Sequence, residues 1–291
     1  IKPGVVVSGT RIEPPLHPKG PEKVIKDFGI EPEEFQEQEL LDWYNRYRPK
    51  QETTEGIFAP WAIYKEDFLK IGGHDPLYAP QSKEDSDIFN RFVLAGYKLV
   101  QTREGCVYHM TCRGSRFADG AKRNPDGEVF MKNRETDEWL AQNERSTRNF
   151  IRKWGTMVEH DEYLKPIITP KYDIAFIPKG KCNSVLLRAL EPYCNNLYLN
   201  DTELIEDYIN NEQPNTDFDL NNRLMSSNVD NDILVTFDSE LINQQNFHYL
   251  TQLPKIIQDS GVVGEFTLDI FNVKINKIKT YEKELINCDT N

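Results

Sequence analysis

Hydrophobic and polar positions follow two separate series along this chain, and each series predicts its own set of strands and helices. In the first series, residues 4–10 (GVVVSGT) read as a buried strand and residues 33–47 as an amphipathic helix. Residues 65–73 and 83–96 read as helices that stop at glycines, and YKLVQT and GCVYHMT follow as two strands. The proline-rich segment RIEPPLHPKGPE after the first strand is expected to be a surface loop.

The second series restarts the pattern at Tyr172, after the charged linker HDEYLKPIITPK. Strands YDIAFIP, NNLYLND and NDILVTFD alternate with helices of about ten residues, and GEFTLDIFNVKI reads as one long alternating strand. Strands separated by such helices predict βαβ crossovers and a largely parallel sheet. We therefore expect an α/β chain of two domains, residues 1–160 and a small three-layer α/β domain over residues 171–291.

Composition narrows the class of protein. The 291 residues are 38% hydrophobic and 28% charged, with a net charge of −12, which argues against nucleic acid as the main partner. No run approaches the roughly eighteen apolar residues of a membrane span. The five cysteines show no C-x-x-C spacing, so reduced thiols and a cytoplasmic location are expected.

The strongest cluster of titratable residues extends from the end of the first glycine-stopped helix to the strand that follows the second one. Glu84, Asp85 and Asp87 occupy a helix start, with His74 nearby and His109 on the later strand. Carboxylates complement the positive end of a helix dipole, but three acids in four residues exceed what capping needs. Adjacent carboxylates repel, which raises one pKa and suits a general base. Alternatively, carboxylates and imidazole suit Mn²⁺ or Mg²⁺.

The same stretch resembles a known family. GIFAPWAIYKEDFLKIGGHDPLYAPQSKEDSDIFNRFVLAGYKL, followed by V-Y-H at 107–109 and the basic CRGSR, is similar to the acceptor half of a GT-A glycosyltransferase of the family 2 type. The order and spacing of these elements carry the resemblance, which covers roughly residues 1–155. The signatures of P-loop proteins, dinucleotide-binding folds and α/β-hydrolases are absent from the sequence. The resemblance implies a GT-A-like partial domain (a nucleotide-diphospho-sugar transferase fold) ahead of the second α/β domain.

The resemblance assigns catalytic roles to the acids. Asp85 would be the general base that deprotonates the acceptor hydroxyl for attack on the anomeric carbon, with inversion. Glu84 and Asp87 would orient the acceptor or the base.

The resemblance also implies donor and metal contacts. Arg113 and Arg116 would lie on a basic lid and neutralise the leaving diphosphate. Trp61 would stack on a sugar ring, although a core position is an equal alternative. His109 would complete the metal shell.

The chain departs from the family pattern, because such enzymes carry an upstream nucleotide-binding half that ends in D-x-D. Either that half is missing and the chain is a fragment, or the second domain supplies it. Strand NDILVTFD ends at Asp238-Ser239-Glu240, a D-x-E at the strand end where α/β sheets bind ligands. Asp238 would then be a metal ligand; alternatively, it caps the following turn.

The sequence therefore predicts a glycosyltransferase that moves a sugar from a nucleotide-sugar donor to a glycan or another hydroxyl acceptor, assisted by Mn²⁺ or Mg²⁺. The alternatives are a non-catalytic carbohydrate-binding or assembly module that keeps the fold, and a metal-dependent phosphohydrolase. An incomplete sheet would leave an open edge and apolar surface, which favours a homodimer.

Overall fold

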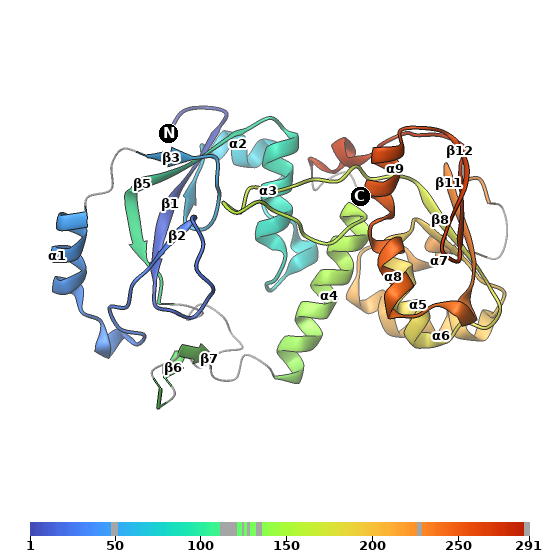
Figure 1. Cartoon of the computed structure of the whole chain (residues 1–291), viewed down its shortest axis with the longest axis horizontal. Helices are drawn as coiled ribbons and strands as arrows, with labels where there is room; N and C mark the ends of the chain where they lie inside the picture. The colour runs from blue at the N-terminus through green and yellow to red at the C-terminus, as the bar shows by residue number, and fades with distance from the viewer. Residues whose placement is uncertain are drawn as a thin grey trace. The chain divides into compact units, whose positions relative to one another are not determined.

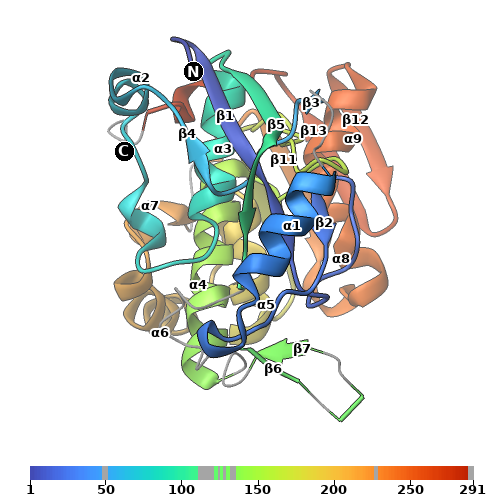
Figure 2. The ribbon, with the colours of Figure 1, turned by 90° about the vertical axis from the view of Figure 1, so that its left-hand side faces the viewer.

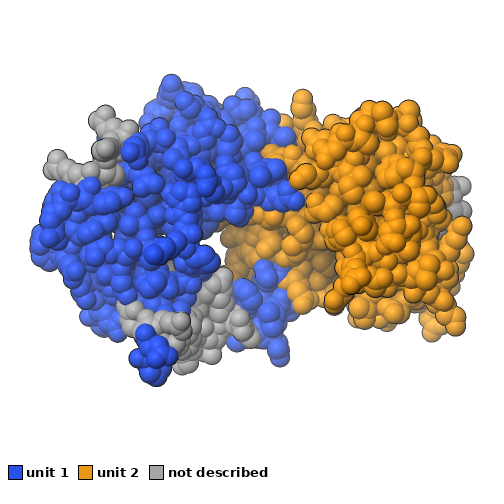
Figure 3. All heavy atoms as spheres, in the orientation of Figure 1, with its two compact units in different colours: residues 1–73, 88–143, 159–167 blue, residues 74–87, 144–158, 168–291 orange. Residues whose placement is uncertain are grey.

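A computed structural model divides the chain into two compact units (Figures 1 and 3). Unit 1 comprises residues 1–73, 88–143 and 159–167, and unit 2 comprises residues 74–87, 144–158 and 168–291. Unit 2 thus takes in two segments, 74–87 and 144–158, that the sequence pattern places in the first domain. The structure describes residues 1–47, 52–110, 121–123, 125–126, 129–131, 136–225 and 229–287.

Unit 1 contains a mixed sheet in the order β2-β1-β5-β3, with β4 antiparallel to β1 (Figure 2). Strands β2 and β5 both run parallel to β1, and β3 runs antiparallel to β5. The strands are β1 (Val5–Glu13), β2 (Lys23–Ile25), β3 (Thr53–Thr54), β4 (Trp61–Ala62) and β5 (Lys98–Tyr108).

Two expectations for this sheet are wrong. Strand β1 continues through Arg11 to Glu13, where the sequence indicates a surface loop, and β5 is one strand where two are expected. Both strands remain paired because the register shifts between Ser8 and Thr10. The glycines of the two strands lie at this irregularity and do not end the strands. A Cβ on Gly9 would lie 2.8 Å from the carbonyl oxygen of Gly105, so the close approach requires glycine.

Three helices of the first series form where the pattern predicts them: α1 (Glu37–Tyr47), α2 (Lys65–Lys70) and α3 (Glu84–Leu94). A longer helix, α4 (Asp137–Trp154), follows a short pair of strands, β6 (Ala121–Arg123) and β7 (Val129–Met131). Helix α3 begins in unit 2 and continues into unit 1, whereas α4 begins in unit 1 and ends in unit 2. None of the helices in the described part of the chain is long and apolar enough to cross a membrane.

Unit 2 is built on a second sheet in the order β10-β9-β8-β11-β13-β12. The first four strands are parallel, β13 pairs antiparallel with β11, and β12 pairs antiparallel with β13, so the expected α/β, largely parallel arrangement is confirmed. GEFTLDIFNVKI is a hairpin and not one strand, because Asp269 takes a left-handed turn conformation at φ 52°. The strands are β8 (Ile174–Lys179), β9 (Asn196–Tyr198), β10 (Leu224–Met225), β11 (Ile233–Asp238), β12 (Gly264–Leu268) and β13 (Phe271–Ile275).

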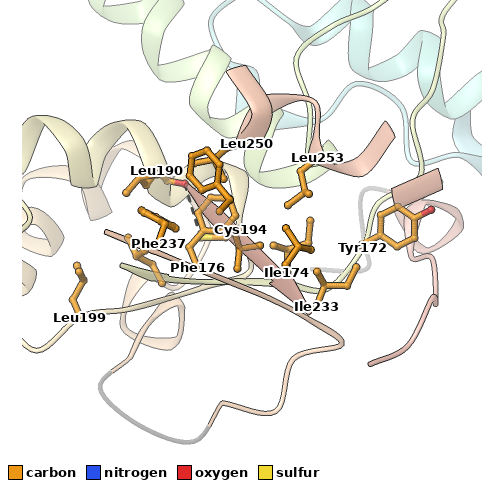
Figure 4. Close-up of a cluster of buried hydrophobic side chains, with 14 of the residues drawn as sticks. Tyr172, Ile174, Phe176, Leu190, Cys194, Leu199, Ile233, Phe237, Leu250 and Leu253 are labelled. Atoms are coloured by element: carbon orange, nitrogen blue, oxygen red, sulfur yellow. Dashed lines mark hydrogen bonds between the residues drawn. The ribbon is translucent and has the colours of Figure 1, made fainter. Parts of the chain in front are cut away.

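The core of unit 2 lies on one face of this sheet. Figure 4 shows Ile174, Phe176 and Phe237 pointing toward Leu190 and Leu250, which come from the covering helices. On the other face, Leu234, Thr236, Asn272 and Lys274 are half-buried or exposed. The described residues thus form a sheet with helices on one face, where three layers are expected. The helices are α5 (Ser184–Leu190), α6 (Thr202–Glu212), α7 (Leu220–Arg223), α8 (Gln244–Thr251) and α9 (Leu253–Ser260).

A buried ion network fastens the end of α4 to α5 and α6 within unit 2. Arg152 Nη2 lies 2.7 Å from Glu191 Oε2 and 2.8 Å from Glu212 Oε1. Arg223 pairs with the other oxygen of Glu191, and Arg148 lies 2.7 Å from Glu212. Burial alone would raise the pKa of Glu191, but the charges of Arg223 and Arg152 and their hydrogen bonds lower it to about 2.

This network makes the stability of unit 2 depend on pH in the acidic range. Because the pKa of Glu191 falls from 4.5 to about 2 on folding, its stabilising contribution is complete above pH 4.5 and is lost as pH falls through about 2. The shift corresponds to about 3 kcal/mol. We expect urea titrations over this pH range to show the loss of stability in the unaltered chain. Hydrogen exchange of β8 and β11 should show the same loss in unit 2. It should persist in the exposed-site control Glu206→Gln and be absent in Glu191→Gln; an equal loss in Glu191→Gln would contradict the assignment.

Candidate functional site

The segment 74–87 of unit 2 is held by a buried cluster of opposite charges. Lys153 Nζ, at the end of α4, lies 2.7 Å from Asp75 Oδ2 and 2.7 Å from Asp87 Oδ1, and all three side chains are almost completely buried. The indole N–H of Trp154 donates to Asp87 at 2.9 Å, and the hydroxyl of Tyr78 lies 3.5 Å from the same oxygen. The structure therefore places Asp87 as an interior ion-paired group that fixes the segment.

Glu84 and Asp85 are placed differently, since they open α3 and remain partly exposed. Burial raises the pKa of the Asp85 carboxyl, and His74 opposes that shift. Burial also raises the pKa of Glu84; its own backbone N–H opposes this and the charge of Asp85 adds to it. Within the described residues neither carboxylate forms an ion pair. The pair is thus poised to accept a proton at a higher pH than an ordinary surface carboxylate.

The backbone that leads into this pair is unusual. Ser82 and Lys83, directly before α3, have φ of 80° and 73°, in the left-handed region that costs non-glycine residues about 1–2 kcal/mol each. Such conformations persist where the surroundings dictate them, and they gather at functional sites. Ser146 of α4 donates a hydrogen bond to the carbonyl of Gln81 at 3.2 Å and holds the segment just before these residues.

The remaining residues singled out in the first series lie in unit 1 or outside the described residues. Trp61 is half-buried and packs edge-on against Phe92 at 5.5 Å between ring centroids, a position that favours packing over an open stacking platform. His109 directly follows β5, and its Nδ1 lies 3.0 Å from Glu13 Oε2. Arg113 and Arg116 lie outside the described residues.

In unit 2, a crevice opens at the carboxyl ends of the parallel strands. Its volume is about 660 Å³, within the range of small-molecule sites. The chain runs from β8 outward to β9 and β10 and then crosses back to β11, so the strand order reverses between β8 and β11. Ligands bind at this kind of switch point in open α/β sheets. The lining combines apolar, amide and charged groups: Ile177, Pro178, Lys179, Gly180, Lys181, Cys182, Tyr198, Leu199, Asn200, Asp201 and Val229.

Asp238 does not line this crevice but lies next to two residues that do, Lys179 and Gly180. It ends β11 in register with Lys179, and a Cβ on Gly180 (φ 81°) would lie 3.2 Å from its Oδ1. Ser239 fixes the same loop, because its hydroxyl lies 2.7 Å and 2.9 Å from the carbonyls of Lys179 and Lys181. Asp238 also caps the turn, since Oδ1 accepts from the backbone N–H of Glu240 at 2.9 Å. The capping hydrogen bond engages Oδ1 and not Oδ2.

Within the described ranges, no three His, Cys, Asp or Glu side chains gather as a metal-binding group. Mg²⁺ sites that include substrate phosphates need only one or two protein carboxylates, so Asp238 can hold a cation together with a diphosphate. Sequence reasoning missed Lys153 and Glu13, and it missed the lysines of the crevice. Lys179 and Lys181 could have been predicted as site residues, because they follow a strand of a βαβ pattern, where α/β sheets bind ligands.

Comparison of the chain with known proteins gave no match among family models, curated proteins or solved structures.

Proposed function

We propose that the chain transfers a sugar from a nucleotide-sugar to an acceptor hydroxyl, with inversion and with assistance from Mn²⁺ or Mg²⁺. The observation that carries this proposal is the Asp85 carboxyl at the start of α3, whose raised pKa suits a general base. Glu84 adds negative charge beside it, and the buried Asp75–Lys153–Asp87 cluster holds the segment in place. A positioned base of this kind is what removal of a hydroxyl proton requires.

The crevice of unit 2 is the donor site in this proposal. Lys179 and Lys181 offer positive charge to a diphosphate, and the apolar lining offers contact for a base or sugar. Asp238 would hold the divalent cation, which when bound neutralises charge on the leaving diphosphate. The crevice and the acidic segment both belong to unit 2, so one folded unit supplies the base and the donor contacts. This arrangement follows the second expectation from the sequence, in which the second domain supplies the donor half of a GT-A-like fold.

Calorimetric titration of the chain with UDP and with GDP, with and without Mn²⁺, tests this proposal. We expect metal-dependent binding of one nucleotide, weakened about tenfold or more by Asp238→Ala because a metal ligand is lost. Asp85→Ala and the exposed control Asp259→Ala should keep the affinity of the unaltered chain. Failure of both nucleotides to bind would favour the non-catalytic carbohydrate-binding module, and release of phosphate from simple esters would favour the phosphohydrolase.

A further inference from the structure

The sheet of unit 2 has two unequal edges. At one edge, β10 consists of two residues only, Leu224 and Met225. At the other edge, β12 has five residues, Gly264–Leu268, the ordinary length of a strand. Among the described residues β12 pairs with β13 alone, so no strand lies beside its outer backbone groups. Such an edge is a template for pairing with another chain.

Strand β12 has little protection against such pairing. Natural edge strands are usually blunted by lysine, proline, a bulge or a covering segment. This strand contains no proline and no lysine, and its register with β13 is regular. Its one charge, Glu265, lies 3.0 Å from Lys274 of β13. Val262 and Val263, directly before the strand, are 64% and 61% exposed, so apolar surface adjoins an edge that is open to a second strand.

The hydrogen bonds of the hairpin determine which residues of β12 face outward. The backbone N–H of Asn276 donates to the carbonyl of Asp232 at 2.9 Å, which identifies the even-numbered residues of β13 as those that bond to β11. Because bonding alternates in an antiparallel pair, the odd-numbered residues of β13 bond to β12, where they lie opposite its even-numbered residues. The backbone groups of Glu265 and Thr267 therefore point to the free side.

We propose that β12 pairs antiparallel with β12 of a second copy, in the register centred on Phe266. A two-fold pair of strands is antiparallel, and outward residues bond to outward residues of the other copy. Centring on Glu265 opposes that carboxylate to itself, and centring on Thr267 opposes Glu265 to Asp269; like charges directly opposite destabilise a pair. The register centred on Phe266 places Glu265 opposite Thr267 at both ends. It alone uses both outward residues of each strand.

The side chains of this register also fit one another. Phe266 packs against the core of unit 2 and lies opposite its own copy in the more closely spaced kind of antiparallel pair. Leu268 lies opposite Gly264, where a Cβ would meet nothing within 4 Å, so there is room for the larger side chain. Aromatic and apolar pairs of this kind stabilise neighbouring strands.

This interface does not rest on the proposed function. The dimer expected from the sequence relies on an incomplete sheet in the first domain, whereas β12 belongs to unit 2 and joins two six-stranded sheets into one. Because the same strand serves on both sides, the interface closes at two copies. Two strands of five residues bury little surface, so we expect a weak, reversible dimer.

Sedimentation equilibrium of the whole chain over micromolar concentrations tests the interface, and we expect a reversible dimer. Thr267 is exposed, so its substitution leaves the core intact. Thr267→Lys sets a lysine opposite Glu265 at two places and should lower the dissociation constant about 2- to 30-fold. Thr267→Glu opposes like charges and should raise the constant by a similar factor. The control Thr202→Glu adds the same charge at an exposed threonine of α6 and should leave the constant unchanged.

Cysteine crosslinking tests the register. Phe266 lies opposite itself at the short spacing of a pair that is not hydrogen-bonded, where two cysteines can form a disulfide. Phe266→Cys should therefore give a covalent dimer on mild oxidation, above the background of the unaltered chain. Thr267→Cys lies opposite Glu265 and should give much less.

A monomer at every concentration would leave the edge to a different strand and overturn the proposal, as would equal effects of Thr267→Lys and Thr267→Glu. Stronger crosslinking of Thr267→Cys than of Phe266→Cys would overturn the register. Should Phe266→Cys fail to fold, the two charge variants still decide, because only a register that opposes Thr267 to Glu265 gives them opposite signs. Neither readout uses a nucleotide or a sugar, so a failure here is distinct from a failure of the nucleotide titration.

Discussion

Asp85→Asn is expected to lower the rate of sugar transfer about 100- to 10,000-fold, the usual contribution of a positioned general base. The amide keeps the size of the side chain but cannot accept the acceptor's proton. Since Asp85 contributes no donor contact in the proposed reaction, the loss should fall on kcat and leave nucleotide affinity unchanged. The measurement is nucleotide release from a panel of UDP- and GDP-sugars with hydroxyl acceptors.

Asp137→Asn provides a matched control, because Asp137 is an exposed aspartate in the first turn of another helix, α4. It should retain full activity. The pH profile gives a second check: the base works only when ionised, so the rate should rise with pH through the pKa of Asp85, which burial raises above 3.8. A rate limb at the ordinary position of a surface aspartate, or full activity of Asp85→Asn, would exclude Asp85 as the base.

The sequence indicated where the acids lie but not how they differ. A helix start after turn residues, with carboxylates in its first turn, is a local pattern, and α3 begins at Glu84 as that pattern predicts. Asp87 differs from Asp85 in being a buried, ion-paired group, and this difference depends on Lys153 and Trp154 at the end of a helix distant in sequence. Such partners are fixed by tertiary packing, so no local signal distinguishes an interior ion pair from a candidate base two residues earlier.

Strand order and strand length also could not be predicted from the local sequence pattern. Alternating strands and helices predict a parallel sheet, but the reversal of order between β8 and β11, which places Asp238 beside the crevice, follows from the path of the crossovers. Glu13 was hidden for a related reason. The segment R-I-E-P-P reads as a charged loop, and only pairing with β2 and β5 makes Arg11 and Glu13 buried strand residues.

Lys153→Met should lower the free energy of unfolding of unit 2 by about 3–5 kcal/mol, because it leaves Asp75 and Asp87 buried without their shared cation. The side chain is only 2% exposed, so water cannot replace the ammonium group. Urea denaturation gives the free energy, and hydrogen exchange of residues 74–87 shows whether the segment that carries Glu84 and Asp85 has loosened. Transfer activity should fall with that protection, since the base would no longer be held in place.

Two variants make the interpretation of Lys153→Met specific. Lys274→Met removes a lysine from an exposed pair with Glu265, at 3.0 Å, and should change stability by no more than about 1 kcal/mol. The triple variant Asp75→Asn/Asp87→Asn/Lys153→Met removes all three charges and should recover part of the lost free energy of unfolding. The reason is that burying a neutral amide costs less free energy than burying an unpaired carboxylate. If Lys153→Met were as stable as the unaltered chain, or if the triple variant were less stable than Lys153→Met, the ion cluster could not be what holds the acidic segment. The position of Asp85 would then depend on the hydrogen bond from Ser146 and on the packing of Tyr78 against Phe150, whose ring centroids lie 6.4 Å apart.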